Sequence, residues 1–144
     1  MRIFFSGPLT NLADPDKTKA FYARLADQVK ALGFDYFWAF QNGTDPVKNR
    51  EVAPQDVYRR DIEELSQSDL MLSYVGEPST GTGIEIEYAY AHNIPVYLLY
   101  EQGKKISRML RGCPGIKGEV VFIDEADALS QLASLLTDIK RVFA

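Results

Sequence analysis

The residues of this chain that could carry out chemistry are almost all carboxylates. Among its 144 residues there are twenty Asp and Glu, but only one histidine, His92, and one cysteine, Cys113. A single cysteine excludes a disulfide framework and a cysteine-based zinc site, and a single histidine excludes a multi-histidine metal site. A Ser-His-Asp triad would depend entirely on His92. The composition therefore favours acid, base or nucleophilic chemistry by carboxylates, and we expect no metal or other cofactor.

One of these carboxylates, Glu85, follows a segment rich in glycine and hydroxyl groups. Residues 76–83 precede a helix that we expect from Ile84 to His92, with Glu85 in its first turn. Glycines let the backbone approach a ligand, and a helix N-terminus attracts an anion, so the segment suits a phosphate. It lacks the Gly-Lys-Ser/Thr of a P-loop, however, and an ordinary strand-to-helix turn explains it equally well. Glu85 either complements the helix dipole or points into a ligand cleft.

A second carboxylate, Asp61, lies on the helix that we expect over residues 55–67. It comes three residues after Tyr58 and four before Leu65, on or beside the apolar stripe that should face the core. An acid in that position needs a partner or a function. The periodicity alone slightly favours an ion pair with a base such as Arg59 over a functional role.

Apolar segments alternate with helical segments along the whole chain. This pattern predicts a parallel sheet with helices on both faces, and ligands bind such sheets beyond the carboxyl ends of the strands. The length fits one domain, residues 1–144. Residues 41–53 are polar and predict a long surface loop. We expect strands at 3–6, 36–40, 70–75, 95–100 and 119–123, and helices at 15–32, 55–67, 84–92, 104–111 and 125–142.

Charge and hydropathy point to a small-molecule partner. The net charge of −4 argues against binding to a nucleic-acid polymer. No apolar run approaches the ~20 residues of a membrane-spanning helix, and the N-terminal apolar segment is too short for a signal peptide. We therefore expect a cytoplasmic protein with no membrane partner.

Four segments together resemble the nucleoside 2-deoxyribosyltransferase superfamily, and most closely its 2′-deoxynucleoside 5′-phosphate N-hydrolase branch. They are Phe4–Asn11, Arg60–Leu72, Pro78–Glu85 and Ile106–Gly112, of which the third is similar to the signature Pro-Ser-x-Gly-x-Gly-x-Glu. The resemblance implies a flavodoxin-like (Rossmann-like), doubly wound sheet of five parallel strands, a homodimer, and cleavage of an N-glycosidic bond.

The resemblance also implies roles for individual residues. Glu85 matches the nucleophile at the anomeric carbon, and Asp61 matches an acid/base or orienting group. At Phe4 the family usually has a tyrosine whose hydroxyl helps to set the nucleophile, so the chain departs from the pattern there. Ser107 matches a serine that reaches the phosphate in the neighbouring subunit's site. The expected cradle for the 5′-phosphate consists of Gly7, Pro8, Leu9, Thr10, Ser79, Gly81 and Gly83.

Glycosidase chemistry fits these residues independently of the resemblance. Departure of a nucleobase builds positive charge on the sugar, which one carboxylate can trap while a second carboxyl group handles protons. We expect hydrolysis of a nucleoside 5′-monophosphate, ribo- or deoxyribo-, to the free base and the sugar 5-phosphate. The alternatives are base exchange between deoxyribonucleosides, cleavage of a dinucleotide such as NAD, and a nucleotide sensor without turnover, which Phe4 keeps open.

Overall fold

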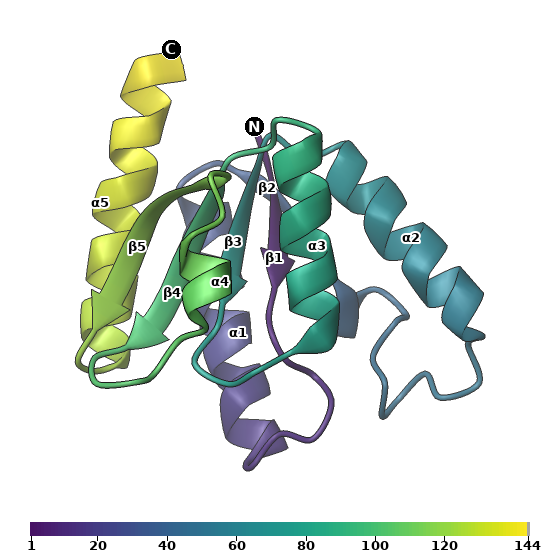
Figure 1. The fold of residues 1–144 in the computed structure, drawn as a ribbon. Coiled ribbons are helices and arrows are strands. Elements are labelled where there is room, and N and C mark those ends of the chain that lie inside the picture. Colours follow the sequence, from purple (N-terminus) through teal and green to yellow (C-terminus); the bar gives the residue numbers. More distant parts are fainter. Residues whose placement is uncertain (144) are drawn as a thin grey trace.

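The computed structural model describes residues 1–143, which form a parallel five-stranded sheet covered by helices on both faces (Figure 1). The strand order is β2-β1-β3-β4-β5, so the chain changes direction across the sheet between β1 and β3. This is the predicted flavodoxin-like fold. The strands are β1 (Arg2–Ser6), β2 (Asp35–Trp38), β3 (Leu70–Tyr74), β4 (Val96–Glu101) and β5 (Ile116–Phe122). The helices are α1 (Pro15–Ala31), α2 (Pro54–Ser66), α3 (Thr80–Ala91), α4 (Arg108–Arg111) and α5 (Glu125–Phe143), with a 3-10 turn, η1 (Ala39–Gln41).

The sheet separates two apolar clusters. Successive side chains of a strand point to opposite faces, so Phe5 packs in the cluster beneath α1 and α5, whereas Phe4 packs in the cluster beneath α2 and α3. Ser6 ends β1 two residues after Phe4 and therefore lies on the α3 face. Within the described residues, none of the helices combines the length and the apolar character that a membrane crossing requires.

The start of α3 differs from the prediction. The helix begins at Thr80 rather than at Ile84, because Ser79 caps it by accepting a hydrogen bond from the backbone N–H of Thr82 at 3.3 Å. Gly81 and Gly83, which suggested a loop, form its first turns instead. Glu85 consequently lies beyond the first turn, so complementing the helix dipole does not explain its presence.

Two later elements also differ in length. β5 begins at Ile116, earlier than predicted, because it pairs with Val96 of β4 across a register shift. Lys117 and Gly118 gave no strand signal in the sequence. A glycine nevertheless fits at position 118 of the strand, because a Cβ there would lie only 3.1 Å from the ring of Tyr97. α4 covers only residues 108–111 of the predicted 104–111.

The polar segment 42–53 is largely exposed, as predicted for a surface loop, but it is anchored to the core at Thr44 and Asp45. Asp45 is fully buried and forms an ion pair with Lys19 of α1, Nζ to Oδ2 at 2.6 Å. Its Oδ1 accepts hydrogen bonds from the backbone N–H groups of Val47 and Lys48. Burial would raise the pKa of Asp45, but Lys19 and these two donors hold it below its ordinary value. Such local side-chain to backbone bonds give a loop a defined shape.

Candidate active site

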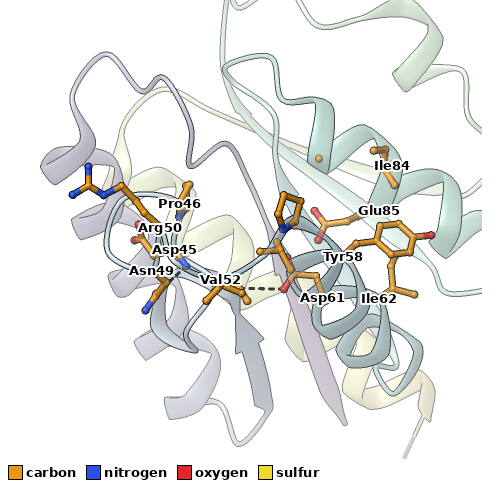
Figure 2. Close-up of a pocket in the computed structure, with 14 residues that line it drawn as sticks. Asp45, Pro46, Asn49, Arg50, Val52, Tyr58, Asp61, Ile62, Ile84 and Glu85 are labelled. Atoms are coloured by element: carbon orange, nitrogen blue, oxygen red, sulfur yellow. Dashed lines mark hydrogen bonds between the residues drawn. The ribbon is translucent and has the colours of Figure 1, made fainter.

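Two adjoining cavities lie beyond the carboxyl ends of β1, β2 and β3. The larger has a volume of about 420 Å³ and lies between α2, the start of α3 and segment 42–53 (Figure 2). The smaller, about 180 Å³, extends from it beneath the loop that follows β1. Asp61 and Glu85 line both cavities. The structure therefore brings the two predicted carboxylates to one place, at the edge of the sheet where parallel α/β folds bind ligands.

Glu85 points from α3 into this space and is half-buried. The hydroxyl of Ser6, at the end of β1, donates a hydrogen bond to Glu85 Oε1 at 2.8 Å. Burial raises the pKa of Glu85 to about 8, and the nearby charge of Asp61 adds to the effect, whereas the bond from Ser6 opposes it. Glu85 therefore retains its proton at neutral pH in the free site.

Asp61 projects from α2 toward the same space (Figure 2) and has no arginine partner among residues 1–143. The ion pair that its position suggested does not form, because Arg59 pairs with Asp56 instead, at 3.1 Å. Thr44 donates a hydrogen bond to Asp61 Oδ1 at 3.2 Å. Burial raises the pKa of Asp61 to about 6, opposed by Thr44 and by the charge of Arg60. Near pH 7 the two carboxyl groups thus share one proton.

The smaller cavity gathers most of the predicted phosphate cradle. Gly7, Leu9, Thr10, Ser79 and Gly81 all line it. The N–H of Thr82 donates to Ser79, so the N–H groups of Thr80 and Gly81 are those that the helix geometry leaves for an anion. A Cβ on Gly81 would meet nothing within 4 Å, which leaves the approach to these groups open.

Position 7 requires glycine for a different reason. A Cβ there would lie 2.6 Å from the hydroxyl oxygen of Tyr22, which donates a hydrogen bond to the carbonyl of Pro8 at 2.9 Å. The absence of a side chain at Gly7 thus lets Tyr22 fix the loop that covers the smaller cavity.

Three predicted site residues do not line either cavity. Pro8 is buried, and its carbonyl is occupied by Tyr22. The N–H of Gly83 donates to the carbonyl of Ser79 at 3.2 Å, so it is already used inside α3. Ser107 caps α4 by accepting from the N–H of Leu110 at 3.3 Å.

Other residues at the site went unnoticed in the sequence. Thr44 lies in a segment whose polar composition gave no sign of burial. Ser6 is a polar residue at the end of a buried apolar strand, and that position could have identified it as a site residue. Trp38 lines the smaller cavity, and its buried Nε1 has no hydrogen-bond partner among residues 1–143. Tyr58, predicted to face the core, is 58% exposed at the rim of the larger cavity.

Phe4, where a tyrosine would be expected, brings no polar atom to the site. It is completely buried and stacks on Phe37 with ring centroids 5.6 Å apart. The hydroxyl group that contacts Glu85 comes instead from Ser6, two residues later on the same face of β1.

Comparison with known proteins shows which family the chain belongs to. Residues 3–132 match the family model described as nucleoside 2-deoxyribosyltransferase. The chain belongs to the nucleoside 2-deoxyribosyltransferase family. This match covers both carboxylates and the whole glycine-rich segment, and it agrees with the resemblance of the sequence motifs.

Relatives within the family include nucleotide hydrolases by name. A protein of Syntrophotalea carbinolica, provisionally named 2′-deoxynucleoside 5′-phosphate N-hydrolase 1, is 32% identical over 96% of this chain and 93% of its own length. The 5-hydroxymethyl-dUMP N-hydrolase of Rattus norvegicus is 28% identical over 65% of this chain and 60% of its own length.

Solved structures of the same fold include an N-glycosidase and a 2-deoxyribosyltransferase by name. The CMP N-glycosidase BcmB of Clostridium botulinum superimposes with a TM-score of 0.73 at 20% identity, covering 94% of this chain and 99% of that one. The 2-deoxyribosyltransferase of Bacillus psychrosaccharolyticus gives 0.66, also at 20% identity, covering 92% and 96%.

Proposed function

We propose that the protein hydrolyses the N-glycosidic bond of a nucleoside 5′-monophosphate, releasing the base and the sugar 5-phosphate. The observation that carries the proposal is the pair of carboxyl groups, Glu85 and Asp61, which line the same two cavities and whose pKa values burial raises. The names of the relatives, which are hydrolases of nucleotides, support the same reaction class. Residues 1–144 would carry this activity as one domain.

The shared proton suits a two-step mechanism. In the free site this proton lies on Glu85, so substrate binding must move it to Asp61, which leaves Glu85 as the carboxylate nucleophile. Glu85 bonds to the anomeric carbon as the bond from that carbon to the base breaks, and Asp61 gives its proton to the departing base. Asp61 then takes a proton from water, whose oxygen attacks the anomeric carbon and releases Glu85 as a carboxylate.

The two cavities have suitable chemistry for the two ends of a nucleotide. The start of α3 with Ser79 and Gly81, together with the loop 7–10, would hold the 5′-phosphate in the smaller cavity. The larger cavity, lined by apolar groups such as Val57 and the ring of Tyr58, would hold the base. Binding the phosphate away from the reacting carbon fixes the sugar against Glu85.

A homodimer would complete the site. The helices of the α3 face expose large apolar side chains, which mark an interaction surface. They are Tyr58 of α2, Ile84 and Tyr90 of α3, and Met109 of α4. Ser107 stands at the start of α4 on this face, from which it would reach the phosphate in the partner subunit's site.

The test is chromatography of free bases after incubation with a panel of ribo- and deoxyribonucleoside monophosphates. The wild-type protein should release base from at least one of them, and Glu85→Gln should lower kcat by about 10⁴-fold or more, because the nucleophile is lost. Glu87→Gln is the matched control, since Glu87 is exposed on the same helix. Full activity of Glu85→Gln would contradict the assignment.

Base exchange is a second candidate, favoured by the match of residues 3–132 to the family model described as nucleoside 2-deoxyribosyltransferase. Adding a free acceptor base to the same assay separates the two reactions, because a new nucleoside or nucleotide forms only in the exchange. Tight binding of a monophosphate with no release of base by either route would instead identify a sensor.

A further inference from the structure

The hydroxyl groups of Ser6 and Thr82 form a chain that ends on Glu85. Ser6 Oγ lies 2.8 Å from Glu85 Oε1 and 3.1 Å from Thr82 Oγ1. Ser6 is 3% exposed and Thr82 is 2% exposed, so water cannot replace either contact easily. The chain joins the end of β1 to the first turn of α3, and both serine and threonine sit within the smaller cavity wall.

We propose that this pair is a reversible hydroxyl relay that positions Glu85 in both of its protonation states. The proposal rests on the function proposed above, in which Glu85 holds a proton in the free site and must lose it to become the nucleophile. Neither residue reacts with the substrate, so both are positioning residues.

The relay follows from the bonding capacity of a hydroxyl group, which has one proton to donate and two lone pairs to accept. When Glu85 is a carboxylate, Thr82 donates to Ser6, and Ser6 donates to Glu85 Oε1. When Glu85 is protonated, it donates to Ser6, and Ser6 donates to Thr82. Only the hydroxyl protons rotate, and every heavy atom stays in place.

Such an arrangement prevents an unpaired polar group from forming in either state. A partner that can only accept would pair with the protonated acid alone. A partner that can only donate, such as a backbone N–H, would pair with the carboxylate alone. The relay also occupies Oε1, which leaves Oε2 of Glu85 for the anomeric carbon.

The charged groups around the cavity do not provide a substitute for the relay. Asp61 faces Glu85 from α2, while Asp45 and Arg50 line the larger cavity from segment 42–53. Asp45 is ion-paired with Lys19. Among residues 1–143, the only hydrogen bond to the carboxyl group of Glu85 comes from Ser6.

A matched control stands beside Ser6 in the sheet. Ser73 of β3 pairs with Ser6 in register and is completely buried, but its hydroxyl has no hydrogen-bond partner among the described residues. It lines neither cavity. Ser6→Ala and Ser73→Ala thus remove the same group at neighbouring buried positions. Only Ser6→Ala removes a hydrogen bond to Glu85.

The experiment follows the titration of the Glu85 carboxyl carbon by NMR, with the signal assigned from its loss in Glu85→Gln. Ser6→Ala removes a donor to the charged form, so we expect the midpoint to move about one pH unit higher. Thr82→Val should shift it in the same direction by less, Thr82→Ser should restore it, and Ser73→Ala should leave it in place. The acid limb of kcat/KM for base release should move by the same amount as the midpoint.

The titration needs no turnover, so it tests the relay even if the protein releases no base. A chain that lacks activity but shows the expected shifts would contradict the proposed function and support the relay. An unchanged midpoint in Ser6→Ala, with the circular dichroism spectrum of the folded protein retained, would overturn the relay. Equal shifts in Ser6→Ala and Ser73→Ala would also overturn it, because they would point to a general effect on the sheet.

Discussion

Glu85 and Asp61 carry the same functional group, yet their surroundings give them different affinities for a proton. Glu85 lies deeper and feels the negative charge of Asp61, which raises its pKa to about 8, whereas Asp61 reaches only about 6. In the free site the higher pKa places the proton on Glu85, so the proposed roles, with Asp61 as the acid, require its transfer when the substrate binds. The single proton of the pair is therefore a property of the environment and not of residue type.

Holding Glu85 in this environment lowers stability at high pH. Between its ordinary pKa of 4.5 and its folded value of about 8, the folded protein binds this proton more tightly than the unfolded chain does. The contribution of Glu85 to folding stability therefore decreases as the pH rises through that window. Glutamine does not ionise, so Glu85→Gln should gain stability relative to wild type as the pH increases.

Thermal melts at pH 5 and at pH 8.5 measure this difference. We expect the Tm of Glu85→Gln minus that of the wild type to be larger at pH 8.5 than at pH 5, and Glu87→Gln to show no such trend. A difference that stays constant with pH would refute the burial of a proton-binding carboxyl at position 85.

The sequence pointed to the two carboxylates as candidates but not to their protonation state. The resemblance of the motifs assigned roles to Glu85 and Asp61, whereas the position of Asp61 on its helix slightly favoured an ion pair. Their protonation depends on Ser6 and Thr44, which come from segments distant in the sequence. No local pattern in a single chain encodes such a contact.

At the scale of elements, local preferences and tertiary structure disagreed at α3, and the predicted surface loop 42–53 proved to have a buried anchor at Thr44 and Asp45. Glycine has a low helix propensity, which made residues 80–83 read as a loop, but the Ser79 cap and packing against the sheet outweigh that preference. Segment 42–53 is polar because its polar groups bond to one another and to Lys19, an arrangement that composition alone cannot separate from solvation.

The ion pair between Lys19 and Asp45 connects segment 42–53 to α1, so Lys19→Met should loosen the wall of the larger cavity. Removing one partner of a buried pair costs about 3–5 kcal/mol, which is enough to open a loop locally before the whole fold unfolds. We expect KM for the nucleotide to rise several-fold with a smaller change in kcat.

Steady-state kinetics and limited proteolysis of residues 42–53 provide the measurement. Lys17→Met is the matched control, because Lys17 is exposed one half-turn away on the same helix. If Lys17→Met and Lys19→Met give the same KM and the same cleavage rate, the ion pair does not anchor segment 42–53.

For the molecule as a whole, the alternation of strands and helices was sufficient to predict the sheet and its layers. Assembly beyond one chain depends on surfaces, and the proposed dimer uses the face that carries α3 and α4. Met109 is 90% exposed on α4 and lines neither cavity of the site. Met109→Glu should raise the dimer dissociation constant by at least about tenfold, because it places a charge in an apolar contact.

Sedimentation velocity over a range of concentrations measures this change. Val142→Glu is the control, since Val142 is 76% exposed on α5, on the opposite side of the sheet. A wild-type protein that sediments as a monomer, or a dimer weakened only by Val142→Glu, would exclude the proposed face.

The bond from Ser6 to Glu85 joins residues that are 79 positions apart in the chain. Closing so long a loop is slow compared with forming a helix, because the entropy is lost before the contact is gained. During synthesis, β1 leaves the ribosome well before its partner on α3 exists. The site therefore cannot form until α3 has been synthesised and packed against β1.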